Sequence, residues 1–271
     1  MNVLSKEKQV QVISAIVEGN SIRSTERMTG VHRDTIMRLV TRVGGSCVHL
    51  LDEKMRRLPC RLIQCDEIWS FVYAKQKHLN GHHNHLTMGD QYVFVALDAE
   101  TKLVPSFLVG KRSPENAYHF MADLQGRLAR RVQLTTDGFR PYLTAVEDTF
   151  GADVDYAMLV KMYGSPREGE ERYSPDEIVN AVPIRITGDP RLQNISTSYV
   201  ERQNLTIRMQ LRRFTRLTNA FSKKLENLKS AMALHFAHYN FVRLHSTLRV
   251  TPAMAAKITD HLWSVQDLLC A

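Results

Sequence analysis

One segment, residues 62–74, constrains the fold more than any other part of the chain. Its letters, LIQCDEIWSFVYA, are mostly apolar, β-branched or aromatic and predict a strand inside a core. Asp66 and Glu67 lie in its middle, and a buried carboxylate without a partner costs several kcal/mol. We therefore expect one acid to reach solvent or to meet a cation. Because neighbouring side chains of a strand point to opposite faces, a single metal ion should bind only one of the two.

The segments that follow predict alternating strands and helices. Residues 61–110 contain three runs rich in Val, Ile, Phe and Tyr, which predict three strands. Ser113 and Pro114 predict the start of a helix, and a strand ending at Asp137, a helix over 141–150 and a strand over 153–163 come next. This order predicts a mixed α/β layer domain. Residues 164–196 are rich in Gly, Pro and charge, so we expect a long ordered loop or insertion there.

The N-terminal residues predict a helix-turn-helix unit. A helix over 5–18 is followed by a short helix, a turn at Gly30 and a second helix from His32 to about Val43. In this motif the second helix enters the major groove of DNA. The residues expected to contact bases or phosphates are Arg33, Asp34, Thr35 and Arg38. Three-helix units also serve as protein–protein modules or as scaffolding, and both alternatives stay open.

Charge and composition narrow the function further. The formal net charge is +8, which favours an anionic partner, and residues 201–229 alone hold eight Lys or Arg against two Glu. The four cysteines form no CxxC pair and the first residues lack the apolar stretch of a signal peptide, so we expect a cytoplasmic protein. No apolar run reaches the roughly 18 residues that a membrane-spanning helix needs.

Two further acids lie where chemistry is commonly placed. Asp137 ends a predicted strand at the carboxyl end, where α/β sheets carry their sites, and Glu201 lies in the first turn of a predicted helix. Each has a simpler explanation. Asp137 precedes Gly138 and could form a turn, and Ser198 with Glu201 matches a capping box.

The helix that begins at Ser198 is expected to run to about residue 218 with two distinct faces. Helical spacing predicts burial of Val200, Ile207, Leu211 and Phe214. The same spacing places Glu201, Asn204, Arg208 and Arg212 together on the other side. An acid would then stand beside groups able to hold phosphate, although a solvated helix face would look the same. Lys161, near the end of the strand over 153–163, is a further candidate phosphate contact.

Four segments together resemble the catalytic core of insertion sequence 1 family transposases, which are Asp-Asp-Glu recombinases of ribonuclease-H-like fold. The segments are CDEIWSFV, LTTDGFRPYL, ADVDYAMLVKMYG and STSYVERQNLTIRM, in this order within roughly residues 60–245. The resemblance implies that Asp66, Asp137 and Glu201 form a metal-binding catalytic triad, and that the first strand is central in the sheet. Glu67 would then face away from the metal and be structural. The expected cofactor is a pair of Mg²⁺ ions, with Mn²⁺ able to substitute, because phosphodiester cleavage and joining need an activated oxygen and a stabilised leaving oxygen.

The expected fold class is α/β, a ribonuclease-H-like mixed sheet flanked by helices, with a small N-terminal all-α helix-turn-helix domain. The expected divisions are a DNA-binding domain over 1–47, a linker over 48–60, a catalytic core over 61–218 and a C-terminal helical segment over 219–271. The full set of expected DNA contacts is Arg33, Thr35, Arg38, Lys161, Arg202, Asn204, Arg208 and Arg212. The expected partners are transposon-end and target DNA, with a homodimer or higher oligomer assembled on DNA at the nucleoid.

Two histidine-containing segments allow other interpretations. His78, His82, His83 and His85 invite a zinc site, although their spacing matches no familiar one and the stretch reads as a loop between strands. Arg243 and His245 near the C-terminus could support end DNA, but caps and packing explain them equally well. Two other functions also remain: a helix-turn-helix regulator without catalysis, and an inactive or domesticated transposase-like nuclease.

Overall fold

The structure is a computed structural model that describes residues 4–164, 178–215 and 218–270. A mixed six-stranded sheet forms its centre, with the strand order β3-β2-β1-β4-β5-β6. The strands are β1 Leu62–Val72, β2 Gly89–Asp98, β3 Phe107–Gly110, β4 Gln133–Thr136, β5 Asp155–Tyr163 and β6 Ile178–Thr187. β1 is antiparallel to β2 and parallel to β4, β4 is parallel to β5, and β5 is antiparallel to β6. This topology is compatible with the expected ribonuclease-H-like sheet, with β1 central.

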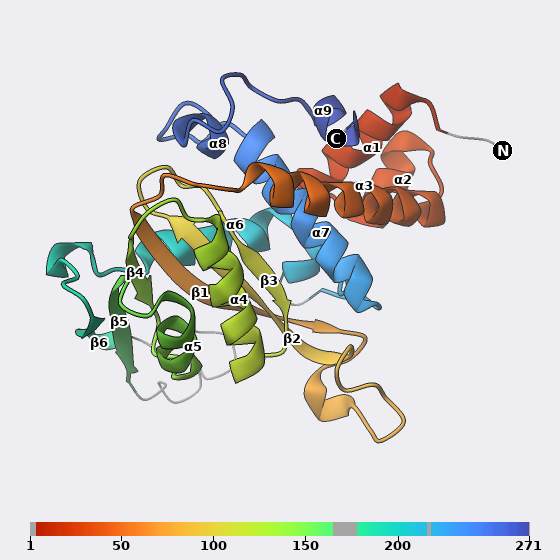
Figure 1. The fold of residues 1–271 in the computed structure, drawn as a ribbon. Helices are drawn as coiled ribbons and strands as arrows, with labels where there is room; N and C mark the ends of the chain where they lie inside the picture. The colour runs from red at the N-terminus through yellow and green to blue at the C-terminus, as the bar shows by residue number, and fades with distance from the viewer. Residues whose placement is uncertain (1–3, 165–177, 216–217, 271) are drawn as a thin grey trace.

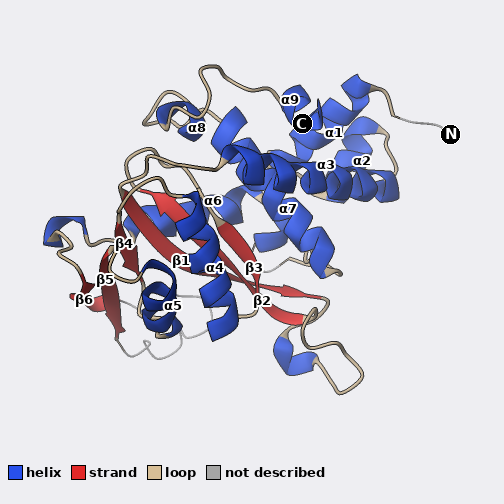
Figure 2. Ribbon diagram, in the orientation of Figure 1, coloured by secondary structure: helices blue, strands red, loops and turns tan. Residues whose placement is uncertain are grey.

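Helices cover both faces of the sheet (Figures 1 and 2). Helices α4 (Pro114–Arg127) and α5 (Pro141–Phe150) lie on one face, where the ring of Phe94 on β2 contacts Phe120 and Tyr142. Helices α6 (Ser198–Gln210) and α7 (Leu225–Ala237) lie on the other, where the ring of Phe107 on β3 packs 4.7 Å from Phe236. The predicted start of α4 is confirmed, because the Ser113 side chain accepts a hydrogen bond from the backbone N–H of Asn116.

Three N-terminal helices lie beside α7. They are α1 (Lys6–Val17), α2 (Ile22–Thr29) and α3 (Arg33–Lys54); α3 packs against α7, and α1 and α2 pack against α3. Gly30, at the predicted turn, is in the left-handed conformation. Helix α3 does not stop near Val43. It continues over residues 48–54, which were expected to form a linker, because its extension packs against α7. The short C-terminal helices are α8 (Pro252–Ala255) and α9 (Val265–Cys270), and α9 contacts α1 and α3.

Two further differences from the predictions lie around α6. The stretch 164–196, expected to be a long loop or insertion, contains the edge strand β6. This strand forms because it pairs with β5, and no local sequence pattern predicts it. Residues 165–177 of the stretch lie outside the described part. Helix α6 ends at Gln210 rather than near residue 218, and a short 3-10 turn, Arg212–Phe214, follows it. Arg212 therefore does not share a helix face with Glu201.

The buried residues form one continuous hydrophobic cluster that joins the sheet, the covering helices and α1 to α3. All four cysteines are free, and three of them are buried. Within the described ranges, no helix is both long enough and apolar enough to cross a membrane.

Candidate active site

Asp66 lies in the middle of the central strand, and both of its carboxylate oxygens are held. Oδ1 accepts a hydrogen bond from the Glu67 backbone N–H at 2.8 Å, and Oδ2 accepts one from Nδ2 of Asn204 on α6 at 2.9 Å. Burial raises the pKa of Asp66 to about 6, and the negative charges of Asp137 and Glu201 add to the shift. The negative charge of the Asp66 carboxylate is therefore poorly neutralised by the surrounding protein.

Asp137 reaches the same place from the neighbouring strand. β4 pairs in parallel with β1, with Cys65 opposite Thr136, so the residue after each lies at the same level of the sheet. The Asp137 side chain accepts a hydrogen bond from the backbone N–H of Phe139 at 3.1 Å, which orients it. Burial raises its pKa, against the opposing effects of that hydrogen bond and of the charges of Arg112 and Lys161.

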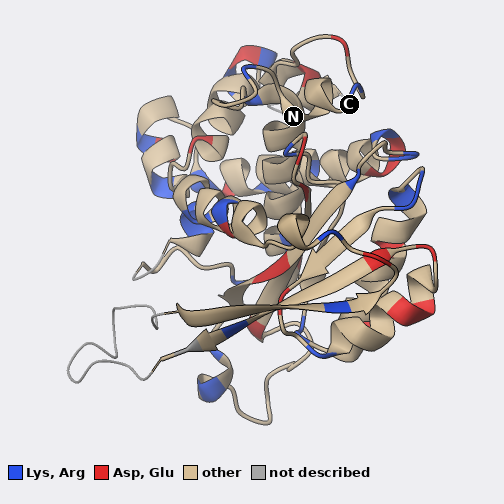
Figure 3. Ribbon diagram, turned by 90° about the vertical axis from the view of Figure 1, so that its left-hand side faces the viewer, with Lys and Arg blue, Asp and Glu red and all other residues tan. Residues whose placement is uncertain are grey.

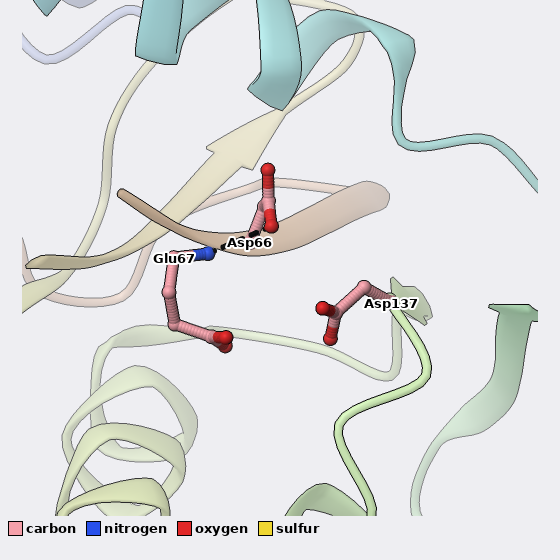
Figure 4. A group of neighbouring side chains, drawn as sticks. All are labelled: Asp66, Glu67 and Asp137. Atoms are coloured by element: carbon pink, nitrogen blue, oxygen red, sulfur yellow. Dashed lines mark hydrogen bonds between the residues drawn. The ribbon is translucent and has the colours of Figure 1, made fainter. Parts of the chain in front are cut away.

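Glu67 joins these two acids, contrary to the expectation from strand alternation. Its side chain leaves β1 on the opposite face from Asp66, as predicted, but its longer carboxylate extends toward Asp137 (Figure 4). Asp66, Glu67 and Asp137 each offer one oxygen, and these oxygens all lie within 4.8 Å of one another. Strand alternation therefore does not by itself keep these oxygens apart, because Asp137 approaches from the end of the sheet between the two strand acids; that a single ion binds only one of the two stays a prediction.

A cation of the chain itself already neutralises part of this cluster. Arg112 donates from Nε to Glu67 at 3.0 Å and lies 3.5 Å from Asp137 through Nη2, while its guanidinium stacks 4.0 Å from the centre of the Phe139 ring. The Glu67 side chain is only 2% exposed and also accepts a hydrogen bond from the Tyr142 hydroxyl. Burial raises the pKa of Glu67 to about 7. Because the Tyr142 hydroxyl and the Arg112 guanidinium both bind its carboxylate, Glu67 is suited to orient Arg112.

Sequence reasoning missed Arg112 and Tyr142 as site residues. Arg112 immediately precedes the Ser113 cap, and Tyr142 lies in the first turn of α5, so both read as parts of helix starts. Their partner Glu67 is distant in the chain, and no local pattern connects them. The only available signal was the unexplained second carboxylate in β1.

Glu201 lies beside the cluster rather than within it. It occupies the first turn of α6, where the Thr197 hydroxyl and the Lys161 ammonium both donate to its Oε1. Its charge raises the pKa of both Asp66 and Asp137, and Asn204, one turn further along α6, hydrogen-bonds Asp66. The capping-box interpretation does not describe this side chain, because the cap residue is Thr197 rather than Ser198 and Glu201 accepts from the Thr197 side chain.

A buried glutamine fixes the helix that carries Glu201. The side-chain oxygen of Gln64 accepts hydrogen bonds from the backbone N–H groups of Tyr199 at 2.9 Å and Val200 at 3.2 Å. These N–H groups belong to the first turn of α6 and have no acceptor within the helix. Gln64 lies two residues before Asp66 on the same strand. The start of α6 is thus attached to the strand that bears the central acid. The predicted burial of Val200, Ile207, Leu211 and Phe214 is confirmed.

The donor set fits a hard divalent cation. Carboxylate oxygens are the ligands preferred by Mg²⁺ and Mn²⁺, and no thiol or imidazole lies in the group. The raised pKa values of Asp66 and Asp137 indicate buried negative charge that a cation would relieve. Asp66 and Asp137 are the better candidates for ligands, because Arg112 and Tyr142 already occupy Glu67.

The expected DNA contacts fall into two groups. Arg33, Thr35 and Arg38 lie in the first two turns of α3, where Arg33 and Arg38 are exposed and Arg38 donates to Thr35. Around α6, Arg202 and Arg212 are exposed, Arg208 is half-buried, Asn204 is bonded to Asp66, and Lys161 is paired with Glu201. Figure 3 shows Asp and Glu both in the middle of the layered body and on outer helices and loops, with Lys and Arg on helices, loops and strands.

The histidines of the loop after β1 bond within that loop. Nδ1 of His83 accepts from the backbone N–H of Asn80, and His85 contacts Asn80 and Gln76. Among the described residues, the carboxylate cluster is the one group placed to hold a metal ion, so the zinc interpretation has no support there. His245 accepts no hydrogen bond on its buried Nδ1, and burial lowers its pKa.

Comparisons with known proteins place the chain in no family. No family model matches the sequence, and no curated protein matches it. Among solved structures, a chain in the crystal structure of the Mos1 strand transfer complex matches with a TM-score of 0.26 and 13% sequence identity. The match covers 86% of this chain and 78% of that chain. A likeness of this degree assigns neither family nor activity.

Proposed function

We propose that this chain is a DNA transposase of the Asp-Asp-Glu type, related to insertion sequence 1 transposases. It would bind the inverted repeats of its element, hydrolyse a strand at the element end and transfer the 3′-hydroxyl to target DNA. One observation carries the proposal: Asp66 of the central strand and Asp137 after its parallel neighbour bring carboxylate oxygens within 4.8 Å of each other, and Asn204, one turn from Glu201 on α6, hydrogen-bonds Asp66. Sites of this kind, at the ends of parallel strands, suit phosphoryl transfer.

The catalytic roles are assigned as follows. Asp66, Asp137 and Glu201 would hold two Mg²⁺ ions, which when bound assist formation of the oxygen nucleophile and stabilise the leaving oxygen. Asn204 orients the Asp66 carboxylate. Lys161 keeps Glu201 in place until a cation binds, and afterwards its ammonium is available to a phosphate. Arg112, oriented by Glu67, presents a further positive charge beside Asp137.

The DNA partners follow from the exposed basic residues. The start of α3, with Arg33, Thr35 and Arg38, would enter the major groove of the inverted repeat as a helix-turn-helix, while Arg202, Arg208 and Arg212 would hold the cleaved end. Two element ends must be held at once, so a dimer or higher oligomer on DNA at the nucleoid is part of the proposal. The proposed functional units are residues 1–54, which include the whole of α3, 61–218 and 219–271, and this leaves residues 55–60 as the linker.

The test is metal-dependent strand cleavage. The protein should nick DNA that carries the element ends in Mg²⁺ or Mn²⁺ and should cut nothing with a chelator present. Asp66→Asn should abolish cleavage while gel-shift binding to the same DNA stays near the wild-type level. Equal loss of cleavage and binding in Asp66→Asn would contradict the assigned role.

The same assay separates the alternative functions. A helix-turn-helix regulator would bind its site equally well with chelator and cut nothing, and the exposed start of α3 would then be its functional surface. A nuclease without joining activity would nick but would leave pre-cleaved ends unjoined in a strand-transfer assay. A decayed or domesticated copy would bind the ends without either reaction.

A further inference from the structure

A groove lies where the loop between β1 and β2 joins the two strands, and none of the proposed catalytic residues lines it. The loop between the two strands projects from the body (Figure 1). At its base lies a groove of about 400 Å³, lined by Trp69, Lys75, Gln76, Lys77 and Asp90. Trp69 is half-buried and lies on β1 two residues beyond Glu67, on the same face of the sheet. Strand geometry places these two residues only about 7 Å apart along the chain.

Specific contacts build this groove. The backbone N–H of Gln76 donates to the Asp90 carboxylate at 3.1 Å. The Lys111 ammonium donates to the backbone oxygens of Met88 at 2.6 Å and Asp90 at 2.9 Å, which fastens the return of the loop to the body. Gly89 has a φ of +82°, and a Cβ there would lie 2.2 Å from the Gln76 side-chain oxygen. The loop is therefore seated closely on the start of β2.

The indole of Trp69 has a firm support. Its ring lies 5.7 Å from that of Phe71, which in turn lies 4.8 Å from Phe221. The end of β1 is held by a hydrogen bond from the Tyr73 backbone N–H to the oxygen of Ser222. On the groove side, the Lys75 ammonium stands 5.8 Å from the centre of the Trp69 ring. An indole backed by packed rings, with the Lys75 ammonium over it, thus lines the groove, and a base that stacks there would take the place of this mobile ammonium beside the ring.

A strip of planar groups, made of Trp69, Tyr92 and the Arg112 guanidinium, runs from this groove toward the acidic cluster. Trp69 lies directly opposite Tyr92 in the β1–β2 register. The Arg112 guanidinium carbon is 5.9 Å from the centre of the Tyr92 ring, and the same guanidinium contacts both Glu67 and Asp137. A strand of nucleic acid with a phosphate at Asp137 and Arg112, which lie on the same side as Trp69, would have its neighbouring nucleotide over this strip.

The chemistry of the strip selects an unpaired base. Stacking on an aromatic ring needs a free base face, which duplex DNA does not offer within its stack, and nearby Lys charges hold the adjoining phosphates. Among the lining residues, Lys75 and Lys77 carry two positive charges against the single negative charge of Asp90, so the groove remains net positive. We propose that Trp69, with Lys75 and Lys77, forms a stacking site for an unpaired nucleobase next to the cleavage site. This proposal deepens the proposed function, since an unstacked nucleotide beside the scissile phosphate would expose that phosphate to the acids.

The fluorescence of Trp69 provides the test. The chain has two tryptophans, and Trp263 packs against Phe241 in the C-terminal region, so Trp263→Phe leaves Trp69 as the one indole reporter. In this background, with chelator present so that no cleavage occurs, we expect a short single-stranded oligonucleotide to quench the emission. A blunt duplex of the same sequence should quench it much less. Trp69→Leu in the otherwise wild-type chain should weaken single-strand binding by about 5- to 150-fold.

Matched variants make the result decisive. Trp69→Phe keeps an aromatic plane and should restore most of the single-strand affinity, whereas Lys75→Met should weaken it without changing the thermal midpoint. Equal quenching by duplex and single strand would overturn the proposal, as would unchanged affinity in both Trp69→Leu and Lys75→Met. Because binding is measured without metal, an inactive protein that still quenches would contradict the transposase proposal while supporting the stacking site.

Discussion

Asn204 on α6 donates a hydrogen bond to Asp66 on β1, over 2.9 Å, and this contact joins the helix that bears Glu201 to the strand that bears the central acid. The other oxygen of Asp66 is held by the backbone of its neighbour. The carboxylate is therefore fixed in plane and direction before any cation arrives. Fixed ligands of this kind lower the cost of organising a metal site.

The first prediction concerns this contact. Asn204→Ala should lower the affinity for Mn²⁺ by about 10- to 100-fold, because a hydrogen-bond partner of a proposed ligand is lost while the ligand remains. Leu205→Ala, on the exposed side of the same helix, is the control and should bind Mn²⁺ as the wild type does. Titration calorimetry measures both. An unchanged affinity in Asn204→Ala would show that Asp66 does not depend on the amide.

The second prediction concerns the stability of the metal-free protein. The folded-state pKa of Asp66 is raised to about 6, above its unfolded value near 4, so its ionised form destabilises the fold above about pH 6. Asp66→Asn should therefore increase the free energy of unfolding at pH 7.5 by about 1–3 kcal/mol. It should also remove the stabilisation by Mg²⁺.

Asp155→Asn is the matched control, because it should change the free energy of unfolding in the opposite direction. Arg131 hydrogen-bonds Asp155 and lowers its pKa, so neutralising Asp155 should destabilise the protein. Urea unfolding with and without Mg²⁺ gives both values. A loss of stability in metal-free Asp66→Asn would mean that the carboxylate is satisfied within the fold and is not waiting for a cation.

The third prediction concerns the close approach of two helices. A Cβ on Gly44 of α3 would lie 2.3 Å from the backbone oxygen of Ser230 on α7, whereas a Cβ on Gly45 meets nothing within 4 Å. Gly44→Ala should destabilise the protein by about 1–3 kcal/mol, because the helices must move apart. Gly45→Ala should be neutral or slightly stabilising, since alanine favours the helix. Urea unfolding of the pair tests the packing, and equal stability of the two variants would contradict it.

The fourth prediction concerns acid pH. Burial lowers the pKa of His235 to about 3 and that of His238 to about 4, so both are neutral in the folded state. The unfolded chain takes up these protons below about pH 6.5, so their contribution to stability is complete above that pH and is lost as the pH falls toward 4. Asp66 and Glu67, with raised pKa values, act in the opposite sense over part of this range.

A variant isolates the histidine contribution. His235→Leu should flatten the fall in stability between pH 7 and pH 4 relative to wild type, because one buried proton acceptor is gone. His119→Leu removes a histidine whose side chain is 58% exposed and should leave the profile unchanged. Thermal unfolding across this pH range measures the slopes. Parallel profiles for wild type and His235→Leu would contradict a neutral buried imidazole.

Local patterns in the sequence were enough to predict much of the fold. The three strands after residue 61 are rich in β-branched and aromatic residues, and Ser113 and Gly30 act at helix ends for local reasons. The extension of α3 was missed because Gly44 and Gly45 suggest a helix end, and its stability comes from contact with α7. Strand β6 was missed because it lies at an exposed edge, contains Pro183 and is defined by pairing with β5.

Some residues of the candidate site could also be predicted from local patterns, whereas others depend on contacts between distant parts of the chain. Asp66 and Asp137 stood out because a strand interior and a strand end are unusual places for acids. The roles of Glu67 and Arg112 depend on contacts across the sheet and could not be deduced from spacing. The link from Gln64 to the start of α6 is equally non-local, since a buried glutamine in a strand has no pattern that names its partner.

Anomalous scattering from crystals soaked in Mn²⁺ is the most direct test of a metal site at Asp66 and Asp137. We expect a peak bounded by oxygens of Asp66 and Asp137, with the Glu201 carboxylate released from Lys161 to join it, and no such peak in Asp66→Asn. A wild-type crystal with no manganese at these carboxylates, or with the ion held only elsewhere in the chain, would contradict it.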